Sequence, residues 1–208
     1  TNRVTATILL GSDFSAWDVA ITPDGTKAYV TMGGFYPSTI SSSVFVIDTA
    51  SNTVIGTISL GGNAFGIAIT PDGTKAYVAH TIDVVPTYVS VINVATNSVI
   101  ATVTVGNNPQ GVAVTPDGTK VYVANSITND VSVISTATNT VTATVPVGSF
   151  PYGVAITPDG SKAYVTNVSS QTVSVINTAT NTVIATVSGL SGAPRGIAIT
   201  PDGTKVYV

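Results

Sequence analysis

Apolar and polar residues alternate along most of the chain in short runs, and the alternation has the two-residue period of a β-strand. Segments 111–115, 120–124, 131–134 and 141–145 show it most regularly and are rich in Val, Ile, Thr and Tyr. Such runs are typical of strands whose two faces meet different surroundings. Since no window carries a helical period of comparable length, the pattern predicts an all-β protein.

A ten-residue phrase, Ile21-Thr-Pro-Asp-Gly-Thr-Lys-Ala-Tyr-Val30, joins the first two strands of each group and occurs five times with conservative exchanges. Proline presets φ at the second position of a turn, and glycine adopts φ > 0 without steric cost. Each copy is therefore predicted to end one strand, turn tightly and begin the next. Its prolines stand at 23, 71, 116, 158 and 201, so the repeat is 42 to 48 residues long.

A period of this length with four strands is the signature of a propeller blade. Short links, Pro-Asp-Gly between the first two strands and Ala-Thr-Asn between the last two, make sequential strands antiparallel neighbours. The first strand carries Gly and Ala, as expected where backbones crowd around an axis. The fourth is rich in Thr and admits Pro146, which suits an outer edge strand.

We therefore predict a single β-propeller domain over residues 1–208, with four complete four-stranded antiparallel blades and a partial fifth. The predicted units are approximately 17–60, 65–105, 110–147, 152–187 and 195–208, with residues 3–9 as the fourth strand of the fifth unit. The third strand of that unit is missing. Strands about 4.8 Å apart cannot bond across a gap, and bare edges favour pairing with another chain. Residues beyond Val208, a neighbouring molecule, or a larger ring or filament would each fill the gap.

Three motifs carry a resemblance to a known family: Thr-Pro-Asp-Gly-Thr-Lys-Ala-Tyr-Val-Thr at 22–31, Tyr-Val-Thr-Asn at 164–167 and Asn-Thr-Val-Ile-Ala-Thr-Val at 181–187. The chain resembles the YVTN-type β-propeller repeat family of archaeal and bacterial surface-layer proteins over essentially its whole length. The resemblance implies a propeller fold and a surface-layer-like setting. It implies little about chemistry, because function resides in sites built onto such folds. Members are mostly seven-bladed, which this length does not supply.

Composition narrows the classes of partner. The formal charge is −3 and only 8% of residues are charged, so a basic footprint for nucleic acid is absent. The sequence contains no run of about 18 apolar residues, so no membrane span is predicted. With no cysteine and a surface of Thr, Ser and Asn, the chain suits an extracellular or cell-surface protein that does without disulfides. A single His and no Cys argue against metal centres built on those ligands, and we predict neither metal nor cofactor.

The predicted site lies at one mouth of the central channel. Links between strands two and three, and between blades, share the face where the loops vary, and function tends to lie on variable loops held by a rigid scaffold. One position before the small residue of each first strand should ring this mouth: Trp17, Phe65, Gln110, Tyr152 and Arg195. Aromatic residues and Arg are common binding hot spots. The alternative is that these side chains plug the channel and shield the core.

Blade 1 and two longer loops add further candidates on the same face. Asp18 replaces the Gly of the other units and places a carboxylate beside Trp17. The insertions 31–43 and 79–87 contain Tyr36, His80 and Asp83, either as binding residues or as slack loop sequence.

These residues favour a non-catalytic propeller that binds a protein or glycan partner on the loop-rich face, with possible self-assembly through the incomplete last blade. The alternative is a secreted lyase-like or hydrolase-like enzyme with its site at the central channel. Acid–base work would need Asp13, Asp18 and Asp83 to converge. Asp13 and Asp18 are also oxygen ligands of the kind that Ca²⁺ prefers, but the acidic loop motif of such sites is absent.

Overall fold

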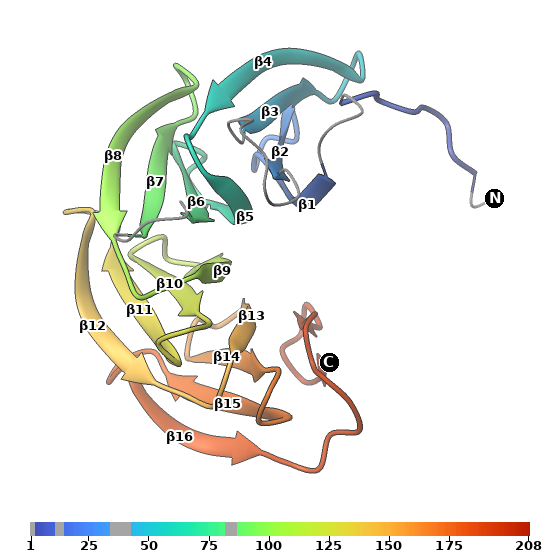
Figure 1. The fold of residues 1–208 in the computed structure, drawn as a ribbon. Helices are drawn as coiled ribbons and strands as arrows, with labels where there is room; N and C mark the ends of the chain where they lie inside the picture. Colours follow the sequence, from blue (N-terminus) through green and yellow to red (C-terminus); the bar gives the residue numbers. More distant parts are fainter. Residues whose placement is uncertain (1–2, 11–14, 34–42, 82–86) are drawn as a thin grey trace.

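The fold of the protein, taken from a computed structural model, is described for residues 3–10, 15–33, 43–81 and 87–208. Every regular element in these ranges is a β-strand (Figure 1). Sixteen strands form four sheets, each with its strands hydrogen-bonded in chain order and antiparallel. Blade 1 consists of β1 (Ser15–Ile21), β2 (Lys27–Gly33), β3 (Ser43–Asp48) and β4 (Thr53–Ser59).

The next three blades repeat this meander. Blade 2 consists of β5 (Asn63–Ile69), β6 (Lys75–Thr81), β7 (Tyr88–Asn93) and β8 (Ser98–Thr104). Blade 3 consists of β9 (Pro109–Val114), β10 (Lys120–Asn125), β11 (Asp130–Ser135) and β12 (Thr140–Pro146). Blade 4 consists of β13 (Pro151–Ile156), β14 (Lys162–Asn167), β15 (Thr172–Asn177) and β16 (Thr182–Val187).

The blades are arranged radially, with β1, β5, β9 and β13 nearest the centre and β4, β8, β12 and β16 on the outer rim (Figure 1). A fifth unit follows as a hairpin of β17 (Ala198–Ile199) and β18 (Val206–Tyr207). The ring is open between this hairpin and β1 (Figure 1). Four complete blades and a partial fifth confirm the predicted fold class.

The predicted strand over residues 3–9 is not formed, because the described chain offers no neighbouring strand to hydrogen-bond with residues 3–10. Ile8 and Leu10 nevertheless pack against the core of blade 1 formed by Val30, Met32 and Ile47. In the same way the end of β4 packs against blade 2 through Ile58 and Leu60. The segment therefore keeps the side-chain packing of a fourth strand without its backbone pairing.

The repeated phrase forms the same turn in every unit. In blade 1, Gly25 has φ 71°, and its N–H donates to the Thr22 carbonyl at 2.7 Å. The Asp24 carboxylate accepts the Thr22 hydroxyl at 2.6 Å and the Thr26 N–H at 3.0 Å. Equivalent bonds, first of all from the Thr hydroxyl, lower the pKa of Asp159 and of Asp202 to about 2. The carboxylates of the phrase are therefore used within the turn.

Buried tyrosines of the phrase join each blade to the next. The Tyr29, Tyr77 and Tyr122 hydroxyls donate to the side-chain carbonyls of Asn97, Asn139 and Asn181, at 2.5, 2.8 and 2.7 Å. Each Asn stands at positive φ in the turn between the third and fourth strands of the following blade. We call this pair the Tyr–Asn latch. Burial, with a smaller effect from Asp72 or Asp117, raises the pKa of Tyr77 and Tyr122 to about 12, so the hydroxyls remain donors.

Candidate functional site

The predicted ring residues stand where the first strand of each blade departs from regular pairing. The ladders between the first and second strands shift register between Ala16 and Asp18, between Ala64 and Ile67, and between Pro151 and Val154. The β9–β10 ladder shifts near the same place. A bulge leaves a residue out of the ladder and re-aims its side chain. The bulges thus turn the ring side chains toward the channel.

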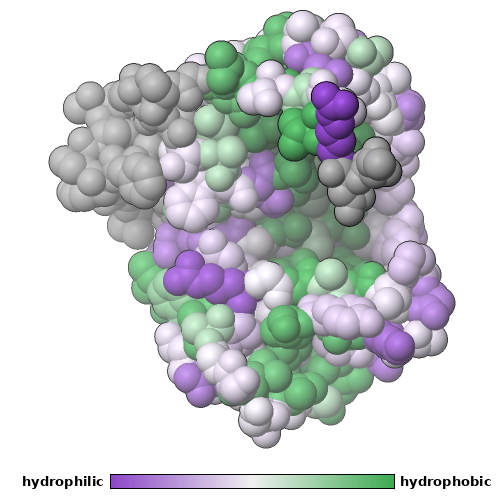
Figure 2. Space-filling view, turned by 90° about the vertical axis from the view of Figure 1, so that its right-hand side faces the viewer, coloured by the Kyte–Doolittle hydropathy of each residue, from purple (hydrophilic) through white to green (hydrophobic). Residues whose placement is uncertain are grey.

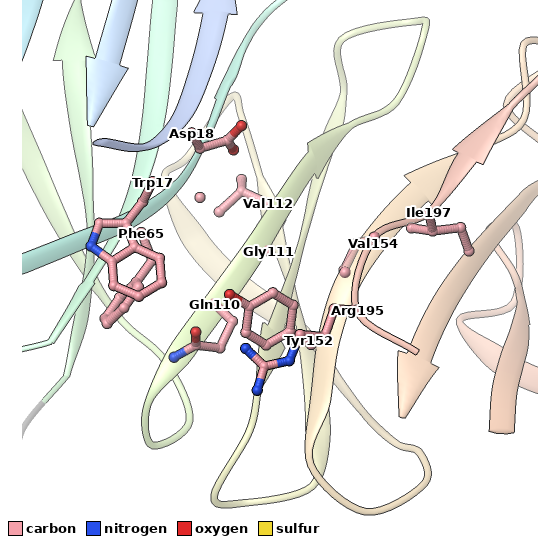
Figure 3. Close-up of a pocket in the computed structure, with 13 residues that line it drawn as sticks. Trp17, Asp18, Phe65, Gln110, Gly111, Val112, Tyr152, Val154, Arg195 and Ile197 are labelled. Atoms are coloured by element: carbon pink, nitrogen blue, oxygen red, sulfur yellow. The ribbon is translucent and has the colours of Figure 1, made fainter. Parts of the chain in front are cut away.

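Together these side chains line one pocket of about 330 Å³ at the mouth of the channel (Figure 3). All six residues predicted from the repeat reach it: Trp17, Asp18, Phe65, Gln110, Tyr152 and Arg195. The pocket lies at the starts of the first strands, and the Pro-Asp-Gly turns lie at their other ends. The structure therefore brings together residues that are spread over 179 positions of sequence, from 17 to 195.

Glycine in the pocket wall is required by close backbone approach. A Cβ on Gly66, Gly111 or Gly153 would lie 2.4 Å from the carbonyl oxygen of Gln110, Tyr152 or Arg195 in the next unit. Only glycine allows adjacent first strands to come this close. The same contact fixes the backbone that carries each ring side chain.

Threonine hydroxyls at the end of the second strand hydrogen-bond to the backbone carbonyls of two ring residues in the next unit. The Thr31 hydroxyl donates to the Phe65 carbonyl at 2.6 Å, and the Thr166 hydroxyl donates to the Arg195 carbonyl at 3.0 Å. Sequence analysis missed this support. The available signal was that positions 31 and 166 carry Thr where the equivalent positions 79 and 124 carry Ala.

The side chains form two groups on the pocket wall. Trp17 and Phe65 pack edge to face, with ring centroids 5.2 Å apart and planes at 64°. The Arg195 guanidinium lies 5.4 Å from the centre of the Tyr152 ring (Figure 3). Gln110 is buried between the two groups. Val112, Val154 and Ile197, which sequence analysis did not single out, complete the wall because they stand two residues beyond Gln110, Tyr152 and Arg195.

Asp18 takes the place of a wall glycine and bonds to the next blade. Its Oδ2 accepts the Ile67 N–H at 3.0 Å and its Oδ1 accepts the Val19 N–H at 2.8 Å. As a whole residue Asp18 is exposed, but its carboxylate is held against blade 2. Desolvation there raises the pKa of Asp18, and the two N–H donors partly oppose the rise. The carboxylate therefore both links two blades and faces the pocket.

His80 lies apart from this pocket. It is 4% exposed on β6, with Nε2 2.8 Å from the Ser90 hydroxyl. The equivalent residues of blades 3 and 4, Asn125 and Asn167, donate to Ser132 and Ser174 at 2.9 and 3.0 Å. His80 thus replaces a structural Asn, and burial lowers its pKa. Of the other predicted residues, Tyr36, Asp83 and also Asp13 lie outside the described residues.

Within the described ranges, no three His, Cys, Asp or Glu side chains gather in a way that would hold a metal ion. The same ranges contain no helix long and apolar enough to cross a membrane.

Comparisons with known proteins support the propeller fold. The family model of the YNCE-like β-propeller matches residues 115–208. The chain is a β-propeller. The propeller and repeat character that the motifs predicted is confirmed, while the match does not single out the YVTN or surface-layer type. A search of curated protein sequences finds no match.

Solved structures show the same fold over nearly the whole chain. One match is hydrazine synthase of Kuenenia stuttgartiensis, 25% identical, with a TM-score of 0.84 over 99% of this chain and 58% of that chain. Another is a functionally unknown protein of Desulfotomaculum acetoxidans DSM 771, 23% identical, with a TM-score of 0.79 over 93% of this chain and 62% of that one. This chain thus spans about three-fifths of the length of each of the two matched chains.

Proposed function

We propose that this propeller is a non-catalytic binding scaffold of the YVTN, surface-layer-like type, which works outside the cell or at its surface. Its binding site is the pocket at the channel mouth, and its partner is a protein or a glycan. One observation carries the proposal. An otherwise repeated framework places five different large side chains at equivalent positions, and all five line one pocket. A merely structural plug has no need for such variety.

The chemistry of the wall supports binding more than catalysis. Trp, Tyr and Arg dominate binding hot spots because they combine large contact area with directed polar groups. Gly66, Gly111 and Gly153 hold the wall rigidly, which lowers the ordering cost of binding. The extracellular setting rests on composition: no cysteine, few charges and a surface of Thr, Ser and Asn.

The enzyme alternative has one observation in its favour. Asp18 has a raised pKa at a pocket, as a general acid requires. It is, however, the one carboxylate among the lining residues, and its oxygens already accept two backbone N–H groups. His80 is bonded to Ser90 inside blade 2. The pocket as described therefore supplies one carboxylate, whereas catalysis by paired carboxylates needs two.

A second part of the proposal concerns the open side of the ring, which we propose is an assembly surface for a further blade of the same repeat. Val19 and Ile21 of β1 are 56% and 60% exposed, whereas Ile67 of β5 is 4% exposed beneath blade 1. Tyr207 is 60% exposed, whereas its equivalent Tyr29 is fully buried. Figure 2 looks into this gap and shows apolar surface on both sides of a hollow.

The Tyr–Asn latch defines what would fit there. Asn52, with φ 55°, stands on blade 1 at the acceptor position that Asn97 holds on blade 2. Tyr207 stands at the donor position on the fifth unit, across the gap (Figure 1). A blade with this repeat would present a tyrosine to Asn52 and an asparagine to Tyr207. Such a blade would come from the same polypeptide or from a neighbouring molecule.

Array binding tests the first part of the proposal. Wild-type protein is applied to arrays of glycans and of extracellular proteins beside two variants, Trp17→Ala/Tyr152→Ala and Ile127→Ala. Ile127 is exposed on the same face, outside the pocket, and is the matched control. We expect wild type and Ile127→Ala to bind the same partners, and the double variant to lose that binding. Partners bound equally by all three proteins would overturn the pocket assignment.

A further inference from the structure

The pocket contains one cationic side chain, and that side chain forms no ion pair with the Asp18 carboxylate of the same pocket or with any other described residue. Arg195 contacts the Tyr152 ring and forms no ion pair among the described residues. Two lysines of the repeated phrase, Lys75 and Lys120, lie on the opposite face and donate to the carbonyls of Thr136 and Thr178 at 2.7 and 2.6 Å. A guanidinium without an ion-pair partner at a pocket mouth attracts anions locally, against the net charge of −3.

The position of Arg195 suits a planar anion. A guanidinium packed over an aromatic ring keeps its N–H edge available, and this fork matches the two oxygens of a carboxylate. Its backbone is fixed by the Thr166 hydroxyl and by the close approach to Gly153. The buried amide of Gln110 faces the same pocket and adds a second polar contact (Figure 3).

An apolar aromatic wall stands opposite these polar groups. Trp17 packs on Phe65, and it is also held against Gly33, where a Cβ would lie 2.8 Å from the indole Nε1. The indole is therefore positioned before any ligand arrives, yet remains 46% exposed. Such a platform suits the face of a six-membered ring.

We propose that the pocket binds a six-membered ring that carries a carboxylate, with the ring on Trp17 and Phe65 and the carboxylate on Arg195. This inference rests on the proposed binding function and specifies its ligand. Asp18 and Gln110 provide hydrogen-bond acceptors for ring hydroxyls, which favours an acidic sugar over an aromatic acid. The ligand class is therefore a hexuronic acid unit of a polysaccharide.

Calorimetric titration with defined probes tests this assignment. The probes are short oligosaccharides of galacturonate and of glucuronate, the neutral galactose and glucose equivalents, and benzoate. The proteins are wild type, Arg195→Gln, Arg195→Lys and Trp17→Ala, with Ile127→Ala and Arg3→Gln as controls outside the pocket. Thermal melting of each variant verifies that it is folded.

We expect wild type and both controls to bind a hexuronate oligosaccharide and not its neutral equivalent. Arg195→Gln should weaken binding about 10- to 100-fold, the effect of losing a charge-assisted hydrogen bond. Arg195→Lys should restore part of the affinity, and Trp17→Ala should reduce it in proportion to the lost ring contact.

Four outcomes would overturn the assignment. Equal binding of neutral sugars, tighter binding of benzoate, or an Arg195→Gln variant that binds as wild type does would each do so. Failure of every probe to bind wild type would do so as well. The proposed scaffold function is tested separately: it fails if the partners found on the arrays bind the Trp17→Ala/Tyr152→Ala variant as well as they bind wild type.

Discussion

The Tyr122 hydroxyl donates a hydrogen bond to the Asn181 side-chain carbonyl at 2.7 Å, across the boundary between blades 3 and 4. The same hydroxyl lies 3.4 Å from the Thr178 carbonyl. The Thr178 carbonyl also accepts the Lys120 ammonium at 2.6 Å, so the Asn181 side-chain carbonyl is the acceptor that depends on Tyr122. The bond joins residues 59 positions apart and fixes the angle between neighbouring blades. The first prediction follows from it.

Tyr122→Phe should lower the free energy of unfolding by about 1–2 kcal/mol, because it leaves the part-buried Asn181 side-chain carbonyl without this donor. Tyr164→Phe is the matched control. Tyr164 occupies the same position in blade 4, but the fifth unit contains no turn between third and fourth strands among the described residues. Urea unfolding of both variants measures the difference. Equal losses for the two would contradict the role of the latch.

Gly111→Ala should be strongly destabilising because the added Cβ would lie 2.4 Å from the Tyr152 carbonyl oxygen. Neither backbone has a flexible group that can yield, so β9 and β13 must separate. We expect a loss of about 2–3 kcal/mol, as for other overpacked sites. Gly196→Ala is the control, since nothing lies within 4 Å of its Cβ position. A comparable melting temperature for the two variants would show that the wall tolerates bulk.

Gly118→Ala tests the turn of the repeated phrase by a different mechanism. Its Cβ would make an ordinary contact with Pro71 at 3.4 Å, but the residue stands at φ 71°. An L-residue in that conformation costs about 1–2 kcal/mol. Gly56→Ala, at ordinary φ with 3.8 Å to the nearest atom, should cost less than half as much. Chemical denaturation of the pair separates backbone strain from steric overlap, and indistinguishable losses would refute the strain argument.

His80 predicts a pH dependence whose sign follows from burial. Burial lowers its pKa in the folded protein, while the unfolded chain titrates near the ordinary value of about 6.5. The unfolded state therefore binds more protons below that value, and stability should fall as the pH drops from 7 to 5.

His80→Asn should remove this slope while keeping the protein folded, because Asn stands at the equivalent positions 125 and 167 and bonds a serine in the same way. Urea midpoints at pH 7 and pH 5 provide the measurement. An identical slope in the variant would assign the dependence to another group.

The fold could be predicted from the sequence because the repeat occurs five times, and in each copy the turn residues and the strand periodicity indicate the same structure. Trp17, Phe65, Gln110, Tyr152 and Arg195 were also predictable as a ring, since equivalent positions of a radial repeat must meet at the axis.

The sequence pattern did not predict the contacts that depend on how closely two blades approach each other. The bond from Ile67 to Asp18 and the support of Arg195 by Thr166 are of this kind. The insertion over residues 79–87 predicts that His80 is a loop residue, yet β6 extends through Thr81 and buries His80. Residues 3–9 have the sequence of a strand but lack the partner that would make them one.

The central claim is that partners occupy the channel-mouth pocket, and Trp17 offers a direct measurement because it is the only tryptophan of the chain. Its emission, excited selectively, is followed while a galacturonate oligosaccharide is added to wild type, Arg195→Gln and Ile127→Ala. The account predicts a saturable change for wild type and Ile127→Ala, with a midpoint shifted at least 10-fold for Arg195→Gln, as expected for a lost charged contact. Binding detected by calorimetry without any change in Trp17 emission would place the partner elsewhere and contradict the account.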